Sequence, residues 1–365
     1  MGKRTAKSCV AFLLSTVMWM AIDPAQAQET KFDAAKYFAG KTIRMQVGFG
    51  PGGGTDLQAR HFAANWGKYM PGHPRFQVTN ITPNTASANR LYKSPPDGMT
   101  IELTGSPNVT NQFSVPQAEY KVEENRMIGT HVASASILFG YKTFPYKTLR
   151  EAVNGKEVVR MGWRTPSQAS AMRMAALSEW LNIPMKFIPG AAGTADSLLE
   201  LERGDTNAWM PGGAGTAWFG LPVMRPGWLK DGTVRPIAII EAPDVEVRAN
   251  KEIGMPSEVP YAADLIPDPE NRRQFIALSN LIDRYSKIFM APPKTPDPII
   301  EAFRTSYAAL LKDKEFAEKL EVLQGDPVQY TPGEIVERDI KQMVKDYVEF
   351  QDAFKTWEDW ARKRF

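Results

Sequence analysis

The sequence almost lacks cysteine. Its single cysteine, Cys9, lies near the N-terminus, so the rest of the chain forms no disulfides and holds neither a thiolate nucleophile nor a cysteine-ligated metal site. Small secreted domains without disulfides are difficult to stabilise, but a chain of 365 residues has enough volume to bury ordinary hydrophobic cores. The length favours two domains.

Histidine is scarce as well, with three residues in the chain, His61, His73 and His131. None belongs to an HExxH motif, and none has an evident serine or aspartate partner for nucleophilic catalysis. No Gly-x-Ser-x-Gly elbow and no paired carboxylates for glycoside chemistry stand out. We therefore expect no metal, no cofactor and no catalytic residues. His61 lies in the helix expected after a glycine-rich segment at 49–56. We favour a His61 side chain that packs against the protein over one that approaches a ligand.

Strong charge bias and internal hydrophobic runs are also missing. The net charge is +3 and no run of Lys and Arg exceeds three residues, which argues against a nucleic-acid partner. The one long apolar stretch, 9–22, follows Lys3, Arg4 and Lys7 and precedes Ala25-Gln-Ala27. This pattern predicts a secretory signal peptide over 1–27. A membrane anchor is the alternative, but spanning a bilayer takes about 20 apolar residues.

What the chain does contain is a repeated alternation of strand and helix patterns. Strands are expected at 42–49, 76–80, 99–104, 158–162, 185–188, 207–210 and 234–240. Helices are expected at 57–69, 87–92, 171–181 and 195–203, and the tail after 297 is almost entirely helical in pattern. Segments 136–141 and 287–291 predict two crossings between the halves. We therefore expect two doubly wound α/β lobes joined by hinge strands, with a ligand cleft between them beyond the carboxyl ends of the strands.

The segment Phe49-Gly-Pro-Gly-Gly-Gly-Thr-Asp56 joins an expected strand to an expected helix. Glycine lets the backbone approach a ligand closely, and the N–H groups at a helix start attract an anion. We predict that Phe49, Gly53, Gly54, Thr55 and Asp56 bind a ligand, with Asp56 or Thr55 capping the helix.

A tight turn without a ligand and a dinucleotide site are the alternatives for this loop. Gly48, Gly50 and Gly53 match the spacing of the dinucleotide fingerprint, but Pro51 interrupts it, and no acidic residue follows about 20 positions on. A P-loop is excluded because no Gly-Lys-Ser/Thr follows. Anion binding is the favoured interpretation.

The order of several motifs resembles one family. After Phe49–Asp56 come Lys93-Ser-Pro-Pro-Asp-Gly-Met-Thr100 and Leu103-Thr-Gly-Ser106, then 158–170, 188–197, 201–205, Ala291-Pro-Pro-Lys-Thr-Pro296 and 330–334. This order is similar to that of the Bug/TctC family, the extracytoplasmic receptors of tripartite tricarboxylate transporters, over nearly the whole chain after 27. The pair Pro-Gly-Gly-Gly-Thr-Asp and Pro-Pro-Asp-Gly at this spacing carries the resemblance most specifically.

The resemblance implies a type II periplasmic-binding-protein fold. Lobe 1 is expected over 28–138 and 286–365, and lobe 2 over 139–285. It also implies a non-catalytic, monomeric periplasmic receptor that passes a small carboxylate to membrane transporter subunits. The second binding loop would be Arg164-Thr-Pro-Ser-Gln-Ala-Ser170, from which Arg164, Thr165, Ser167, Gln168, Ala169 and Ser170 are predicted to contact the ligand.

Departures from the family pattern add further candidates. The segments 81–87, 163–166 and 209–213 differ from the usual motifs, and 266–284 resembles an insertion. Arg164 is a candidate partner for a second carboxylate, with a surface arginine as the alternative. Trp209 and Gly213 end an expected strand, where an aromatic face suits a flat ligand, although packing in the core is the simpler role for the tryptophan. Ser106 and Asn108 are further polar candidates.

Two other functions use the same fold. A secreted enzyme would convert its ligand and place a perturbed acid or base in the cleft, whereas a receptor binds its ligand unchanged. A periplasmic sensor would share the binding chemistry and differ only in its signalling partner.

Overall fold

The computed structural model describes residue 2 and residues 32–105, 107–132, 136–163, 166, 169–190, 194–210, 221–240, 256–324 and 327–365. The predicted signal peptide therefore lies almost wholly outside the described residues. Within the described ranges, no helix has both the length and the apolar character needed to cross a membrane.

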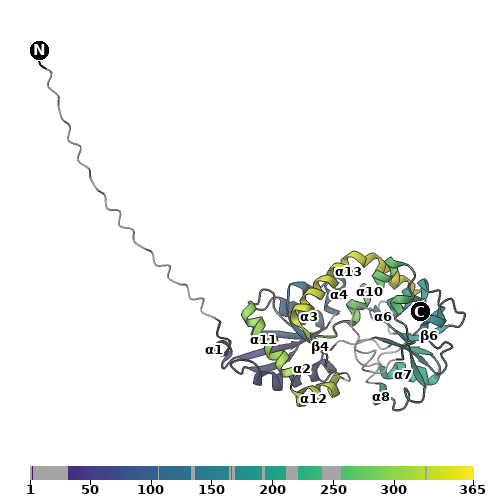
Figure 1. Cartoon of the computed structure of the whole chain (residues 1–365), viewed down its shortest axis with the longest axis horizontal. Helices are drawn as coiled ribbons and strands as arrows, with labels where there is room; N and C mark the ends of the chain where they lie inside the picture. The colour runs from purple at the N-terminus through teal and green to yellow at the C-terminus, as the bar shows by residue number, and fades with distance from the viewer. Residues whose placement is uncertain are drawn as a thin grey trace. The chain divides into compact units, whose positions relative to one another are not determined.

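The described elements alternate between strands and helices along most of the chain (Figure 1). The strands are β1 (Thr42–Val47), β2 (Arg75–Asn80), β3 (Thr100–Thr104), β4 (Arg126–Val132), β5 (Ile137–Tyr141), β6 (Val159–Trp163), β7 (Met185–Pro189), β8 (Ala208–Trp209), β9 (Val234–Ile239), β10 (Lys287–Ala291) and β11 (Thr331–Pro332). The helices are α1 (Ala34–Phe38), α2 (Gly54–Asn65), α3 (Asn84–Tyr92), α4 (Pro107–Ser114), α5 (Leu149–Ala152), α6 (Ala169–Trp180), α7 (Thr194–Arg203), α8 (Leu221–Met224), α10 (Pro269–Asp283), α11 (Asp297–Leu311), α12 (Lys314–Gln324) and α13 (Gly333–Arg362). Short 3₁₀ turns lie at Trp66–Lys68, Val122–Glu124 and Ala262–Leu265.

The largest sheet has six strands in the order β11-β4-β10-β3-β1-β2. Strands β2, β1 and β3 are parallel, as the strand–helix alternation predicts. The sheet is not wholly parallel, however, because β10 runs antiparallel to both β3 and β4. The crossing segment predicted at 287–291 is this strand, inserted between two strands that lie far earlier in the sequence.

One face of the six-stranded sheet is covered by α2 and α11 through an aromatic cluster. The Phe62 ring of α2 lies 4.8 Å from that of Phe289 on β10, and Trp66 lies 5.2 Å from Tyr307 of α11. Both Phe62 and Trp66 are fully buried. Side chains at i and i+4 share one face of a helix, so this pair fixes the inner face of α2 against the sheet.

The strands between β4 and β10 form two smaller sheets. An antiparallel sheet has the order β8-β5-β9, and β6 pairs with β7 in parallel. The antiparallel sheet has its own core, which includes Phe139, Trp209 and Leu221. The segment that resembled an insertion is mostly α10, which Asp268 caps by accepting the Asn271 N–H at 2.8 Å.

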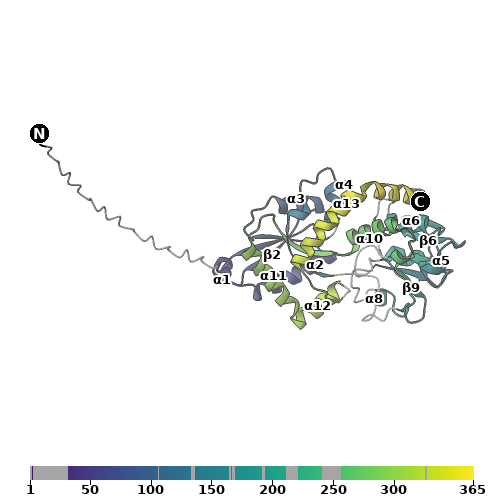
Figure 2. The ribbon, with the colours of Figure 1, turned by 45° about the horizontal axis from the view of Figure 1, so that its top comes forward.

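Helix α13 extends from the six-stranded sheet to the smaller sheets, as both views show in yellow (Figures 1 and 2). Its 30 residues correspond to a length of about 45 Å at 1.5 Å per residue. Just beyond its end, Arg364 accepts the Phe187 N–H of β7 through its carbonyl at 2.8 Å. The predicted lobe boundaries remain a prediction, and α13 belongs by its contacts to both sets of sheets.

Candidate ligand-binding site

The glycine loop after β1 leads directly into α2. Gly52 adopts a φ of +80°, a left-handed conformation that favours glycine. Gly53 is extended and precedes the helix, which begins at Gly54, three residues before the expected start. The first helical hydrogen bond joins the Leu57 N–H to the Gly53 carbonyl at 2.9 Å. Among the described residues no acceptor receives the N–H groups of Gly54 and Thr55, so they remain available to an anion.

Asp56 holds this loop but does not cap the helix in the predicted manner. It lies in the first turn of α2, and its carboxylate accepts the Gly52 N–H at 2.8 Å, while no side chain caps the helix at Gly53. The Asp56 side chain is 1% exposed, so its carboxylate is not open to a ligand. The expected capping role of Thr55 is wrong.

The charge of Asp56 is stabilised by its neighbours. Arg60 Nε and Asn80 Nδ2 donate to its two oxygens at 2.9 Å each. Burial raises the pKa of this carboxyl, but the hydrogen bonds from Arg60, Gly52 and Asn80 outweigh burial and lower the pKa to about 2. Asp56 is therefore ionised throughout the neutral range, and the Arg60 guanidinium offsets its charge.

Asn80 is a site residue that the sequence analysis missed. Besides Asp56, its amide donates to the Phe49 carbonyl at 2.9 Å, so it connects both ends of the glycine loop to the end of β2. The sequence pattern could have identified Asn80, because this residue ends an expected strand. The carboxyl ends of neighbouring parallel strands lie at one edge of the sheet, where β1 leads into the glycine loop. Phe49 itself is 38% exposed.

Asn108 belongs to a second polar group at the same edge of the sheet. Its amide donates to Thr104 Oγ1 at 2.8 Å, and its oxygen accepts from Asn84 Nδ2 at 2.7 Å. Asn108 is 1% exposed, and these bonds engage both polar atoms of its side chain. Asn84, which begins α3, was also missed by the sequence analysis and lies directly against Gly48.

We expect Gly48→Ala to destabilise the protein and disturb the loop. A Cβ atom at Gly48 would lie 2.3 Å from Asn84 Oδ1 and 3.0 Å from the Asn84 Cα, so the start of α3 must move. Overpacking of this kind costs about 1–3 kcal/mol. Gly50→Ala is the matched control, because nothing lies within 4 Å of a Cβ placed there. Chemical denaturation measures both variants, and equal midpoints would contradict the expectation.

The other predicted site residues have different outcomes. Ser106, Arg164, Thr165, Ser167, Gln168 and Gly213 lie outside the described residues. Ala169 and Ser170 begin α6, two residues before the expected start, and Ser170 is 3% exposed. Trp209 lies in the core of the antiparallel sheet, where it stacks on Phe139 with ring centroids 5.5 Å apart.

His61 of α2 and His131 of β4 both contact other side chains of the protein, but only His131 is fully buried. His61 stacks on Phe316 of α12 at 4.3 Å, and its Nε2 lies 3.1 Å from the Phe316 carbonyl. In the described part of the chain, no three histidine, cysteine or acidic residues gather to hold a metal ion.

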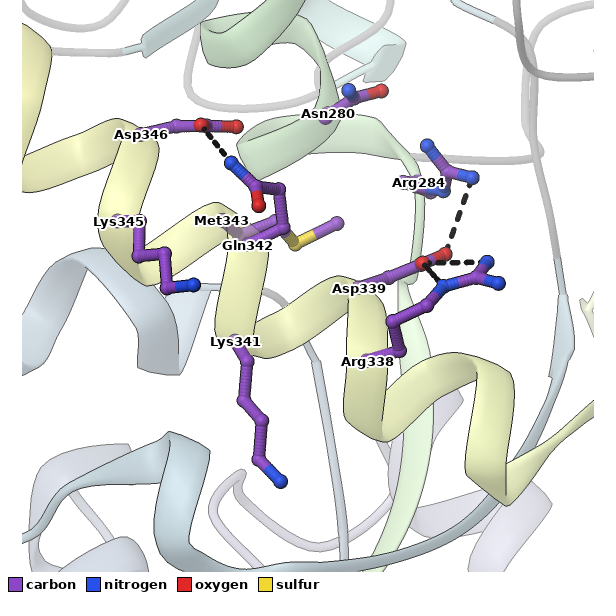
Figure 3. A pocket seen from close by; sticks show the side chains of 9 residues that line it. All are labelled: Asn280, Arg284, Arg338, Asp339, Lys341, Gln342, Met343, Lys345 and Asp346. Carbon is purple, nitrogen blue, oxygen red and sulfur yellow. Dashed lines mark hydrogen bonds and ion pairs between the residues drawn. The ribbon is translucent and has the colours of Figure 1, made fainter.

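A hollow of about 610 Å³ lies between α10 and α13, away from the glycine loop. Its charges are partly satisfied within the protein: Asp339 pairs with Arg284 and Arg338, and Gln342 donates to Asp346 (Figure 3). None of the predicted ligand-binding residues lines it. The glycine loop is therefore the better candidate site.

Comparisons with models of protein families and with curated protein sequences found no match. Solved structures do match. A TctC solute-binding protein from Polaromonas shares 17% identity, covers 88% of this chain and 98% of its own, and superposes with a TM-score of 0.64. Rpa4515 of R. palustris, solved with adipate, shares 18% identity at a TM-score of 0.54, with 86% and 97% covered. BugD, a periplasmic binding protein, shares 20% identity at a TM-score of 0.54, with the same coverage. The chain therefore has the two-lobed α/β fold of the type II periplasmic binding proteins.

Proposed function

We propose that this protein is a Bug/TctC-type receptor of the periplasm that binds a small organic carboxylate and delivers it to a tripartite tricarboxylate-type membrane transporter. The observation that carries the proposal is the start of α2, where the N–H groups of Gly54 and Thr55 have no acceptor among the described residues. A carboxylate at this point gains backbone hydrogen bonds and the favourable end of the helix dipole without a side-chain cation.

The surroundings of the loop fit such a role. Asp56 accepts the Gly52 N–H at 2.8 Å and Asn80 donates to the Phe49 carbonyl at 2.9 Å, while Arg60 donates to Asp56 at 2.9 Å. These bonds fix the loop, so its N–H groups are preorganised before a ligand binds. Preorganisation lowers the entropic cost of binding. The similar fold of the Polaromonas TctC protein and of Rpa4515, which was solved with adipate, supports a carboxylate as the ligand class.

Thermal unfolding of the purified protein with a panel of compounds tests the ligand class. The panel contains aliphatic and aromatic mono-, di- and tricarboxylates, each with its amide analogue. A ligand at about 100 times its Kd adds about 2.7 kcal/mol of stability, which raises the unfolding midpoint by several degrees. Stabilisation by a carboxylate and not by its amide supports the proposal. Stabilisation only by compounds without a carboxylate would refute it.

We expect Asp56→Ala to weaken carboxylate binding by about tenfold or more, because the variant loses a charge-assisted hydrogen bond to the loop worth roughly 1.5–3 kcal/mol. Asp268→Ala is the matched control, since Asp268 caps α10 with one backbone bond of the same kind. The control should lose about 1 kcal/mol of stability and retain its affinity. Titration calorimetry with the carboxylate found in the panel measures both variants. If folded Asp56→Ala bound the carboxylate with unchanged affinity, the loop that Asp56 holds would not contribute to ligand binding.

A further inference from the structure

Strand β4 brings a buried histidine to the sheet edge that carries the glycine loop. Strand β10 is antiparallel to both β3 and β4, so β4 runs in the same direction as β3 and β1. The carboxyl ends of these three strands therefore lie at one edge of the sheet. His131 is the last residue but one of β4 and is fully buried. The sequence analysis assigned no role to this histidine.

Both ring nitrogens of His131 have a buried partner. Nε2 lies 3.0 Å from Gln58 Oε1 on α2, and Nδ1 lies 2.9 Å from the Tyr307 hydroxyl on α11. Burial lowers the pKa of His131 to about 3, and the charge of Lys287 lowers it further, so the ring is neutral. An amide oxygen only accepts, so Nε2–H donates to Gln58 and Nδ1 accepts the Tyr307 O–H. The one donor and the one acceptor of the neutral ring are both used.

Gln58 connects this hydrogen-bonded chain to the start of α2. It lies four residues after Gly54, on the same face of the helix. Further along α2, Phe62 and Trp66 pack against the sheet, but apolar contacts have no preferred direction. A hydrogen bond has a defined length and direction, and a fully satisfied buried network specifies one arrangement of a core. The bond from His131 therefore fixes the depth and rotation of the first turns of α2, and with them the directions of the N–H groups at its start.

We propose that His131 is a positioning residue for ligand binding, which acts through its hydrogen bond to Gln58 by holding the start of α2 where its N–H groups face the ligand. The proposal rests on the proposed function, which places a carboxylate at Gly54 and Thr55. Tyr307 holds the His131 ring from the other side. A bond with a purely structural role would change the free energy of unfolding and leave the affinity for a carboxylate as it is, so the two roles give different results.

Three variants test this assignment. Gln58→Met keeps the length of the side chain and removes the acceptor for Nε2–H, and His131→Leu removes the donor. We expect each to lower carboxylate affinity about three- to tenfold, the range that one neutral hydrogen bond implies. His131→Gln places an amide N–H donor near the position of Nε2 and should restore affinity to within about twofold of wild type. Titration calorimetry with adipate, and with the panel carboxylate that stabilises the wild type most, measures all three.

Ser306→Ala is the matched control. The Ser306 hydroxyl accepts the Trp66 indole N–H at 2.9 Å, and both residues are buried. This bond also joins α11 to the α2 region, but Trp66 follows the last residue of α2, at the far end from the glycine loop. We expect urea denaturation to show a loss of stability similar to that of Gln58→Met, while the affinity of Ser306→Ala stays within about twofold of wild type.

The outcomes separate this proposal from the proposed function. If Gln58→Met and His131→Leu lose stability but bind as the wild type does, the network is only structural and the proposal is wrong, while the receptor function stands. A loss of affinity in Gln58→Met alone, an equal loss in His131→Leu and His131→Gln, or an equal loss in Ser306→Ala would also overturn it. If no carboxylate binds the wild type, the receptor function fails and the role of His131 fails with it.

Discussion

Glu102→Gln is expected to stabilise the protein by about 3 kcal/mol at pH 7 and by much less at pH 4. Glu102 lies in the middle of β3, fully buried, beside Gln46 of β1 and Met290 of β10. Neither oxygen of its carboxyl has a partner at hydrogen-bonding distance among the described residues. Burial raises its pKa to about 8, and the nearby Ser87 hydroxyl offsets only part of this effect.

The sign of this effect follows from the two protonation states. In the unfolded chain the carboxyl has its ordinary pKa of 4.5, and in the folded protein the pKa is about 8. Below pH 4.5 the group is neutral in both states and costs nothing. Between pH 4.5 and pH 8 the unfolded chain releases a proton that the folded protein keeps, so stability falls as the pH rises. At about 1.4 kcal/mol per pH unit, the loss reaches about 3 kcal/mol at pH 7.

Urea denaturation of wild type and Glu102→Gln at pH 4 and pH 7 measures this difference. His131 also titrates, since its lowered pKa removes stability as the pH falls below about 6.5, but it is present in both proteins and cancels in the comparison. Glu258→Gln, at an exposed position, is the control and should change stability by less than about 0.5 kcal/mol. A difference between wild type and Glu102→Gln that does not grow with pH would show that Glu102 is not held in its neutral form.

Trp357→Ala is expected to destabilise the protein by about 3–5 kcal/mol, the range measured for truncation of large buried aromatic side chains. Trp357 is 1% exposed near the end of α13. Its ring lies 5.1 Å from that of Trp180 on α6 in an edge-to-face arrangement and 5.3 Å from Phe354. The substitution leaves a cavity where α13 packs against α6.

Chemical denaturation of Trp357→Ala and Val348→Ala tests this expectation. Val348 lies on the same helix but is 51% exposed, so its truncation should cost less than about 0.5 kcal/mol. A loss from Trp357→Ala no larger than that of the control would mean that the end of α13 contributes little to stability, although it lies against α6 in the structure.

The sequence alone determined the features that depend on neighbouring residues. Strand and helix periodicity placed β1, β3 and β10 to within about two residues, and the glycine run between β1 and α2 predicted a helix start with free N–H groups. The helices α2, α3 and α6 begin two or three residues earlier than expected. The first turn of a helix needs no internal acceptor for its N–H groups, so the loop residues before each apolar pattern were free to join it.

The tertiary structure decided what depends on pairing between distant segments. Only the sheet order shows that β10 runs antiparallel to β3 and β4, so that β4 ends at the edge that carries the glycine loop and His131 contacts Gln58, 73 residues away in the sequence. Only the folded chain shows that Asn80 donates to the Asp56 carboxylate and that the buried Glu102 carboxyl has no partner at hydrogen-bonding distance in the described part of the chain. Local propensity carries no information on strand register. Register determines which polar side chains lie together at the edge of a sheet and which are buried in its interior.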